Sequence, residues 1–465
     1  MPNILRNLPS VSQLLESPPL KKMVETINHG VVADGVRSFL DELRTQVSSA
    51  AEEMPIPSPS EMAEKIADWI RTEEQPYLRS VVNGTGIILH TGLGRAPIAQ
   101  SALDSVREIS SGYASVEVDV HTGERGQRVK AVEKLICELT GAEAALVTNN
   151  NAAATMLTLS AMAKGREVIV SRGQLIEIGG SYRLPDVMEC SGAKLREVGT
   201  TNKTHLYDYE RAINEETGAL LKVHPSNFEV VGFTKTVLTP ELAQLARQHN
   251  VPLIDDIGSG ALIDYSQFGL KNEPVAGQSI SDGADVILFS GDKLIGGPQC
   301  GIVAGKRKYI QQILKDPLMR AMRVGKMTLA ALHATLLLYR DEEKVKQEVP
   351  LLRMLSMPVE NLKIRAEKIA SQLASTRFVE QSDAVEEEAM LGGGSLPDQR
   401  IPSWCVSVKP VASVDALAAM LRRGTPSVLG RVKQDRLLLD MRTISPADDL
   451  AVVKAFESLD SSADA

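Results

Sequence analysis

Between residues 80 and 330, short apolar runs alternate with longer segments that have helical spacing. Runs such as 144–147, 284–289 and 301–304 contain almost no polar side chain and are bounded by turn residues. Such runs predict strands that are buried on both faces, as in a parallel sheet. Because these strands alternate with helices along the chain, the pattern predicts an α/β fold with a mainly parallel central sheet.

The N-terminal region has a different pattern. Residues 1–75 predict short amphipathic helices, and the helical spacing is clearest in Val36–Leu43. The prolines in Pro55–Pro59 divide this region into two parts, because proline interrupts a helix. We therefore expect a helical extension ahead of the α/β region.

The C-terminal region predicts a second, smaller domain of mixed α+β type. A helical stretch beyond Glu342 leads to a turn at Gly392–Gly394, and the acidic run Glu386–Glu388 before it is expected in a surface loop. The segments that follow predict a strand, a helix, a hairpin and a last helix, at 401–408, 414–422, 428–442 and from 446 onward. The whole chain thus divides into predicted domains at 1–75, 76–335 and 336–465.

The composition indicates a folded cytoplasmic protein. Hydrophobic residues make up 43% of the 465 residues, yet no apolar run approaches the ~18 residues of a membrane helix, and the first residues lack the pattern of a signal peptide. The four cysteines lack metal-ligand spacing, so we expect reduced thiols and no metal site. The net charge of −8 argues, taken alone, against a nucleic-acid partner, because phosphate contacts need lysine and arginine.

One lysine, Lys293, lies between a predicted buried strand that ends at Phe289 and a glycine-rich turn. We expect poor solvation there, which lowers the pKa of an ammonium and makes the amine partly neutral and nucleophilic. A nucleophilic amine is what a Schiff base with an aldehyde such as pyridoxal phosphate requires. The neighbouring Asp292 is expected to orient the lysine, to transfer a proton or to cap the turn. For Cys300, packing in the turn is preferred over the alternative of a catalytic role.

Two aspartates, Asp255 and Asp256, end an apolar strand that begins at Val251. A buried carboxylate against the pyridine nitrogen of the cofactor keeps that nitrogen protonated, so the ring withdraws electrons more strongly. Successive strand residues point to opposite faces, so only one of the two can face the ring. We prefer Asp256 for this role, and the competing interpretation is that either aspartate caps the following turn.

A polar loop follows another apolar strand and precedes a helix-forming segment. Its residues Thr148, Asn149 and Asn150 are the candidates that would hold a phosphate, because backbone N–H groups at a helix N-terminus attract anions. Asparagine is also an ordinary helix cap, so this loop alone is weak evidence. The loop, the aspartates and the lysine follow one another in the order in which ligand groups occur at the carboxyl ends of a parallel sheet.

In this order, the motifs resemble those of the fold-type I pyridoxal phosphate enzymes, whose fold is aspartate aminotransferase-like. The resemblance is closest to the bacterial selenocysteine synthases, the L-seryl-tRNA(Sec) selenium transferases, and covers nearly the whole chain. It rests on five segments: Val82–Pro97, Ala144–Ala154, Glu177–Asp186, Asp256–Gly260 and Ser290–Gly301. It implies pyridoxal phosphate as cofactor, with Ser290 and Lys293 among its contacts.

The resemblance also implies a reaction and its partners. Enzymes of this family convert L-seryl-tRNA(Sec) to L-selenocysteinyl-tRNA(Sec) by β-elimination to a dehydroalanyl intermediate, which accepts selenium from selenophosphate. Residues 1–75 would then recognise tRNA(Sec), and the chain would assemble as a decameric ring of dimers. Charge gives no independent support for this tRNA-binding role, because acidic side chains outnumber basic ones in residues 1–75.

Arginines form a further group of candidates. The resemblance implies that Arg95, Arg128 and Arg320 surround the anion of the selenium donor. Arg125 is the alternative candidate for the position of Arg128. Several guanidinium groups in one pocket suit a small dianion. The full set of candidate residues for the donor anion is Arg95, Arg125, Arg128, Arg320 and Arg323.

Two basic features have an open interpretation. Arg442 lies where many fold-type I enzymes bind the substrate carboxylate, but that carboxylate is esterified in an aminoacyl-tRNA, so another role is open. The basic stretch from Lys306 to Lys326 is either a tRNA contact or a solvated helix face.

Near Ser171–Leu175, no aromatic side chain is available to cover the cofactor ring, which leaves Arg172 or Gln174. A lyase or transferase that acts on a free small amino acid or amino sugar would share every cofactor motif. Such an enzyme would have no need of residues 1–75.

Overall fold

The computed structural model describes residues 8–49, 57–73, 77–179 and 182–463. The chain divides into two compact units, Met1–Ser80 and Val81–Ala465. Each unit has its own hydrophobic core. We therefore describe them separately.

The N-terminal unit is helical, as expected. Its described helices are α1 (Val11–Leu15), α2 (Pro18–Thr26), α3 (His29–Ser49) and α4 (Pro59–Glu73). Apolar side chains from all four helices, among them Leu14, Leu20, Val36 and Ile66, form its core. The predicted helical segment lies within α3, whereas Pro55 of the predicted break lies outside the described residues. Neither here nor in the rest of the described chain is any helix both long and apolar enough to cross a membrane.

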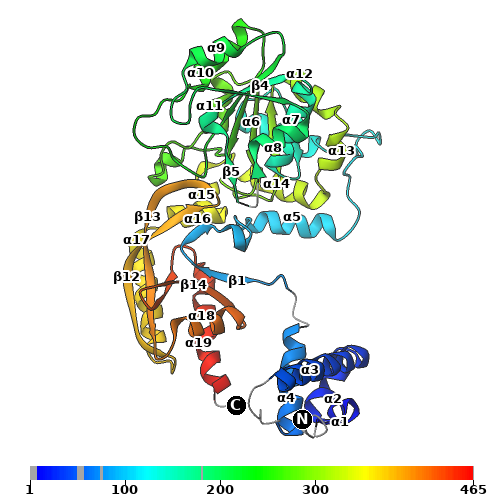
Figure 1. Ribbon diagram of the computed structural model, residues 1–465, viewed down its shortest axis with the longest axis vertical. Coiled ribbons are helices and arrows are strands. Elements are labelled where there is room, and N and C mark those ends of the chain that lie inside the picture. The colour runs from blue at the N-terminus through cyan, green and yellow to red at the C-terminus, as the bar shows by residue number, and fades with distance from the viewer. Residues whose placement is uncertain (1–7, 50–56, 74–76, 180–181, 464–465) are drawn as a thin grey trace. The chain divides into compact units, whose positions relative to one another are not determined.

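Seven described strands form the central sheet of the larger unit (Figure 1). In spatial order they are β3 (Ala144–Thr148), β11 (Gly301–Gly305), β10 (Val286–Ser290), β9 (Leu253–Gly258), β8 (Thr217–Val223), β4 (Glu167–Ser171) and β7 (Lys194–Val198). Strand β11 is antiparallel to both of its neighbours, and all other neighbouring pairs are parallel. The prediction of a mainly parallel α/β sheet is confirmed.

Helices cover both faces of this sheet. Val286 and Leu288 of β10 contribute to a core shared with α7, α8 and α12, whereas Ile287 and Phe289 contribute to a core shared with α6, α11 and α14. Because side chains alternate along a strand, both sets must be apolar, which explains the continuous apolar runs. The helices are α5 (Gln100–Ser110), α6 (Lys130–Thr140), α7 (Asn151–Ala163), α8 (Leu184–Ser191), α9 (Leu206–Ala212), α10 (Thr239–Gln248), α11 (Ala276–Ser281), α12 (Arg307–Leu314), α13 (Leu318–Met322) and α14 (Lys326–Leu338).

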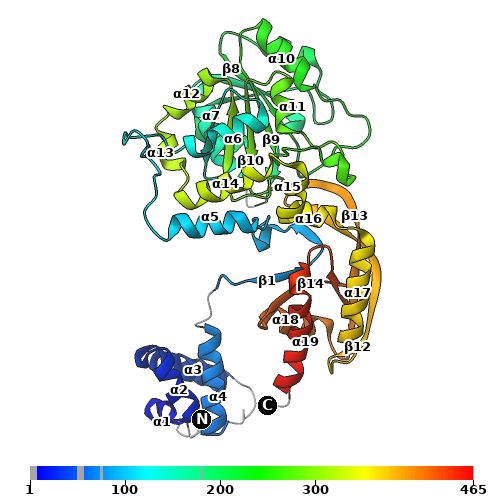
Figure 2. The same cartoon turned by 180° about the vertical axis from the view of Figure 1, so that it is seen from behind.

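A second sheet belongs to the C-terminal part of the larger unit (Figure 2). Its strands, in spatial order, are β1 (Val81–Gly84), β14 (Ser427–Lys433), β15 (Arg436–Asp440), β13 (Ser395–Pro410), β12 (Val379–Gly392) and β2 (Ile87–Leu89). Helices α17 (Val359–Leu373), α18 (Val414–Arg423) and α19 (Asp449–Ala463) pack on it, and α15 (Glu342–Glu348) and α16 (Pro350–Ser356) precede them. This arrangement is the expected small α+β domain.

The first two strands of this sheet come from the other end of the unit. Strand β1 runs parallel to β14, and β2 runs parallel to β12. Residues 81–89 therefore pair with the C-terminal domain, although the predicted boundary placed them in the domain 76–335. An apolar run does not specify its pairing partner, so this assignment required the tertiary structure.

The expectation of a surface loop at Glu386–Glu388 is wrong, because these residues lie inside β12 and pair with β13. Glutamate has a low strand propensity, which is why the sequence pointed to a loop. In the folded protein, the Glu387 carboxylate pairs with Arg431 at 3.1 Å and with Lys433 at 2.5 Å. Arg431 and Lys433 belong to β14, so these ion pairs connect β12 with a strand from which β13 and β15 separate it in the sheet.

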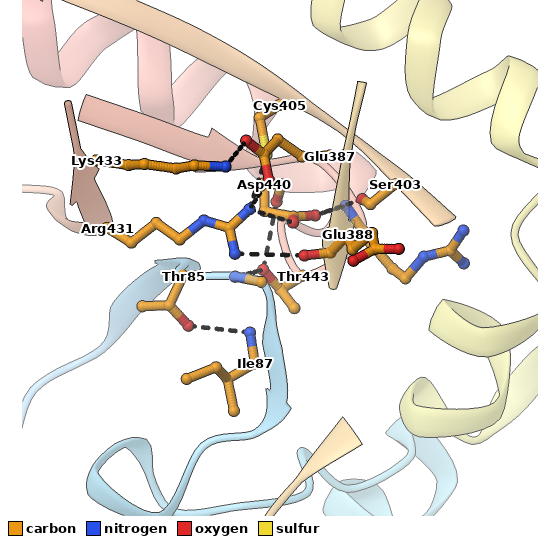
Figure 3. A network of polar contacts seen from close by, with 12 residues as sticks. Thr85, Ile87, Glu387, Glu388, Ser403, Cys405, Arg431, Lys433, Asp440 and Thr443 are labelled. Carbon is orange, nitrogen blue, oxygen red and sulfur yellow. Dashed lines mark hydrogen bonds and ion pairs between the residues drawn. The ribbon is translucent and has the colours of Figure 1, made fainter. Parts of the chain in front are cut away.

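The link between β1 and β2 is held by a polar network on the small sheet (Figure 3). The Gly86 amide donates to the Thr443 hydroxyl at 3.1 Å, close to the buried Asp440 carboxylate. Asp440 Oδ1 accepts hydrogen bonds from the Ser403 hydroxyl at 2.6 Å and from the Arg442 amide at 3.0 Å. Gly86 has φ +77°, and a Cβ there would lie 2.5 Å from Asp440 Oδ2. Only glycine fits this link.

We expect Gly86→Ala to destabilise the protein more than Gly94→Ala does. Both glycines have positive φ, so both substitutions introduce backbone strain of about 1–2 kcal/mol. Only the Gly86 Cβ meets buried atoms, whereas nothing lies within 4 Å at Gly94. Overpacking should lower the free energy of unfolding by a further ~1–3 kcal/mol at Gly86. Urea unfolding of the two variants measures the difference, and equal losses would contradict the Asp440 contact.

Candidate active site

A cavity of about 210 Å³ lies at the carboxyl ends of β8, β9 and β10. In doubly wound α/β proteins, this edge of the sheet is where ligands bind. Six of the residues singled out from the sequence line the cavity: Arg95, Asn150, Asp256, Ser290, Asp292 and Lys293. The structure therefore brings together side chains that lie up to 198 positions apart in the chain.

Lys293 lies in the turn that follows β10, and its side chain is buried, with 6% of the residue exposed. The turn is compact because the Gly291 amide donates to the Cys300 carbonyl and the Gly297 amide donates to the Gly291 carbonyl, both at 2.9 Å. Burial lowers the pKa of Lys293, and the nearby Arg95 guanidinium lowers it further. The amine is thus held toward its neutral, nucleophilic form, as the sequence predicted.

Asp292 is paired with an arginine. Its carboxylate accepts a hydrogen bond from Arg95 at 2.7 Å, and both side chains face the cavity. Arg95 itself has φ +64°, a backbone conformation that non-glycine residues seldom adopt. This ion pair sets the charge beside Lys293, because Asp292 raises the pKa of the amine whereas Arg95 lowers it.

Asp256 is the aspartate that faces the cavity. One carboxylate oxygen accepts from the Asn151 side chain at 2.9 Å and from the Gly258 amide at 3.1 Å, and the other accepts from the Thr155 hydroxyl at 2.9 Å. Burial raises the pKa of Asp256, and these hydrogen bonds oppose that rise. A carboxylate in this state can share a proton with a ring nitrogen.

Asp255 points to the opposite face of β9, as strand alternation requires. Its carboxylate accepts from the Thr239 hydroxyl at 3.1 Å and from the Ser279 hydroxyl at 2.6 Å, and Lys222 lies 3.5 Å away. These partners belong to β8 and to helices on the face opposite α7. This arrangement supports the preference for Asp256 at the cofactor ring.

In the polar loop after β3, only Asn150 lines the cavity. Its side chain caps α7 by accepting from the Ala153 amide at 2.9 Å. The Thr148 hydroxyl donates to the Asn150 carbonyl at 2.9 Å, and the Asn149 amide donates to the Met322 carbonyl at 2.9 Å. Thr148 and Asn149 therefore hold the shape of the loop, while Asn151, which the sequence analysis missed, reaches the cavity.

Three of the candidate arginines gather around one carboxylate outside this cavity. Glu117 is paired with Arg128 at 2.6 Å, with Arg125 at 3.1 Å and with Arg323 at 3.6 Å. Arg128 and Arg125 hold the pKa of Glu117 below its usual value. The cluster adjoins the polar loop, because the Arg323 backbone pairs with that of Thr148.

The remaining basic residues have diverse surroundings. Arg320 is exposed in α13. In the basic stretch, Lys306 pairs with Asp285 at 2.6 Å, and the Lys326 ammonium donates to the Gly112 carbonyl at 2.6 Å. The charge of this stretch is thus partly compensated within the chain.

Neither residue proposed to cover the cofactor ring lines the cavity. Arg172 pairs with Glu197 at 3.1 Å, and Gln174 accepts from the Val223 amide at 3.2 Å. Instead, Tyr182 and His224 line the cavity. Burial and the nearby Asp256 raise the pKa of the Tyr182 phenol. His224 directly follows the apolar strand 219–223, a signal that the sequence analysis did not use.

Arg442 has a structural role in the small domain. It is buried, and its guanidinium donates to the carbonyls of Met354 at 2.7 Å, Met357 at 3.3 Å and Pro402 at 3.1 Å. Burial lowers the pKa of this arginine. Arg442 does not line the cavity, and its guanidinium is engaged by backbone carbonyls.

These features fit pyridoxal phosphate. The aldehyde of this cofactor needs an amine of lowered pKa, which Lys293 supplies, and the ring nitrogen needs a buried carboxylate, which Asp256 supplies. The phosphate needs backbone N–H groups, and the N-terminus of α7 presents Asn150, Asn151 and Ala152 to the cavity.

Fold and cavity together define a class, the fold-type I pyridoxal phosphate-dependent enzymes. A family model described as L-seryl-tRNA selenium transferase matches residues 81–445. A second model, described as the N terminal of selenocysteine synthase, matches residues 5–44. The chain therefore belongs to the L-seryl-tRNA selenium transferase family, which confirms the predicted transferase class.

Known relatives agree with this assignment. An L-seryl-tRNA(Sec) selenium transferase of Maridesulfovibrio salexigens is 48% identical over 450 residues, covering 96% of this chain and 97% of the relative. One of Hyphomonas neptunium is 46% identical over 461 residues, covering 99% of both. Among solved structures, D-glucosaminate-6-phosphate ammonia-lyase has a TM-score of 0.56 at 19% identity and covers 83% of this chain and 97% of its own, which shows a shared fold.

We expect Arg95→Ala to shift cofactor capture to higher pH. Without the Arg95 charge, and with Asp292 released from its ion pair, the ammonium of Lys293 is favoured and its pKa rises. The neutral amine that attacks the aldehyde then forms only at higher pH. The rate at which apoprotein gains visible absorbance from added pyridoxal phosphate, measured from about pH 6 to 10, reports this shift.

Arg125→Ala is the matched control for this measurement. The Arg125 side chain is 83% exposed, and its partner is Glu117 rather than a cavity residue. Its pH profile should match that of the unaltered protein. If Arg95→Ala also leaves the profile in place, the charge of Arg95 does not govern Lys293.

Proposed function

We propose that this protein converts L-seryl-tRNA(Sec) to L-selenocysteinyl-tRNA(Sec), with selenophosphate as the selenium donor. The observation that carries the proposal is similarity over 96–99% of the chain to enzymes with that name. The cavity that joins Lys293 to Asp256 supplies the chemistry. An enzyme for a free small amino acid or amino sugar would use the same cavity but would not need residues 5–44, which match the N-terminal family model.

The residues around the cavity are assigned different roles in catalysis and cofactor binding. When bound, pyridoxal phosphate withdraws electrons from the α-carbon of the amino acid attached to it. Lys293, held toward the neutral amine, removes the α-proton at its Nζ atom. Asp256 holds a proton against the ring nitrogen, and Asn151 and Thr155 fix the position of that carboxylate. Asn150, Ser290 and the N-terminus of α7 bind the phosphate.

Binding of the selenium-donor anion is assigned to arginine side chains. Arg95 lies in the cavity beside Asp292 and Lys293. Arg125, Arg128 and Arg323 place three guanidinium groups around the single carboxylate of Glu117, so their cluster has an excess of positive charge for a dianion such as selenophosphate. Exposed Arg320 completes the set of donor-binding residues.

We further propose that the chain is a cytoplasmic homo-oligomer, a decameric ring of dimers. The segment 111–124 supports association, because Tyr113, Val118 and Val120 expose apolar side chains there. The N-terminal unit is proposed to recognise tRNA(Sec), mainly by the shape of the folded RNA, since its charge is acidic overall.

The proposal is tested by incubating the purified protein with serylated tRNA(Sec) and selenophosphate and by measuring the mass of the aminoacyl group. We expect selenocysteine to replace serine. Lys293→Ala should abolish this conversion, and Asp256→Asn should slow it about 100-fold or more, because the ring nitrogen loses its carboxylate. Asp255→Asn is the matched control and should have a smaller effect, since Asp255 faces the opposite side of β9. Unchanged serine with cofactor bound would contradict the proposal.

We expect removal of residues 1–80 to abolish tRNA(Sec) binding and to leave the visible absorbance of the bound cofactor intact. These residues form a separate unit with its own core, so the cavity in residues 81–465 should persist. Filter binding over a range of salt concentrations measures the affinity. Replacing the exposed Lys315, Arg320 and Arg323 by alanine tests the competing basic stretch, and undiminished affinity after truncation would exclude recognition by the N-terminal unit.

A further inference from the structure

His224 lines the cavity, but it has no part in cofactor binding or in removal of the α-proton as described above. It follows β8 directly, and its backbone amide donates to the Asp256 carbonyl at 2.9 Å, so its place beside the ring-nitrogen aspartate is fixed. Its side chain lines the same cavity as Lys293 and remains 21% exposed. The imidazole is therefore accessible to a substrate that enters the cavity.

A buried carboxylate lies behind this imidazole. Glu273 Oε2 is 3.8 Å from His224 Nε2, and only 1% of the Glu273 side chain is exposed. Within the described part of the chain, this oxygen has no hydrogen-bond partner, whereas the other carboxylate oxygen accepts from the buried Ser259 hydroxyl. A buried carboxylate oxygen is stabilised by a nearby polar partner, and His224 Nε2 at 3.8 Å is such a partner.

The loop that carries Glu273 is fixed by the small domain. The Lys271 amide donates to Gln399 Oε1, and Gln399 Nε2 donates to the Lys271 carbonyl, both at 2.7 Å. Gln399 belongs to β13, so one side chain forms a two-bond clamp between the small sheet and this loop. Glu273 is thereby held against His224 from a second direction, in addition to its contact with Ser259.

We propose that His224 is the proton donor to the hydroxyl group that leaves the seryl β-carbon, and that Glu273 is its positioning residue. This inference rests on the proposed function. After Lys293 has taken the α-proton, the electron pair left on the α-carbon forms the second bond between the α- and β-carbons. The electrons of the β-carbon–oxygen bond go to the oxygen, which takes a proton from His224 and leaves as water. The neutral imidazole then regains a proton from solvent.

The other acids of the cavity are less suited to this step. Burial and Asp256 raise the pKa of Tyr182, which makes its phenol a poor proton donor. The Asp292 carboxylate is already engaged by the Arg95 guanidinium in an ion pair at 2.7 Å. A histidine backed by a carboxylate is the usual general acid near neutral pH.

The test changes the leaving group. Unaltered protein, His224→Asn and Glu273→Gln are each given tRNA(Sec) charged with serine or with β-chloroalanine, and product is measured by mass. Chloride leaves the β-carbon without being protonated. The hydroxyl group, in contrast, must be protonated to leave readily as water. We expect His224→Asn to slow the seryl substrate ~100-fold or more and to leave the chloro substrate nearly unchanged. Glu273→Gln should show the same preference with a smaller loss.

Two further measurements separate catalysis from structure. The visible absorbance of bound cofactor should be the same in all variants, and His224→Asn should still exchange the seryl α-hydrogen with deuterated water, because Lys293 is intact. The control is His249→Asn, an exposed histidine that ends α10, which should behave like unaltered protein. Equal losses for both leaving groups, or loss of α-exchange in His224→Asn, would overturn the inference. Inactivity of the unaltered protein on seryl-tRNA(Sec) would instead overturn the proposed function and this inference with it.

Discussion

The Lys293 amine and the Asp256 carboxylate are both removed from water in one cavity, and the rest of the site depends on how that burial is compensated. Burial shifts the pKa of each group toward its neutral form. Hydrogen bonds from Asn151 and Thr155 oppose the shift at the aspartate. At the lysine, Arg95 reinforces it. The outcome is an amine ready to react and a carboxylate ready to hold a proton.

Helix α7 links the two ends of the cofactor site. Its first residues, Asn151 and Thr155, hold the Asp256 carboxylate, while its N-terminus at Asn150 faces the cavity as an anion site. The close approach of β11 maintains this geometry, because a Cβ at Gly301 would lie 2.2 Å from the Asn150 carbonyl oxygen. One helix thus positions groups for both the ring and the phosphate.

The small domain is tied to the site at several points. Residues 81–89 complete its sheet and then lead directly to Arg95 in the cavity. Gly86 and Asp440 fix the path of that link, and Gln399 clamps the loop that carries Glu273. Arg442 joins the same sheet to the end of α16 through backbone carbonyls. The active site therefore draws residues from the central sheet and is held in shape by the second sheet.

The sequence by itself determined the fold class and the family, and it predicted the poorly solvated position of Lys293. Apolar periodicity is a local property, so it predicted the central strands and the turn at Lys293, and strand alternation showed that only one of Asp255 and Asp256 could face the cavity. Only the tertiary structure decided which one, because that depends on which face α7 covers. It also decided that residues 81–89 join the C-terminal sheet, that Glu386–Glu388 form a strand, and that Tyr182 and His224 reach the cavity. These features depend on partners far away in the chain, such as Arg431 for Glu387, and no local pattern specifies such partners.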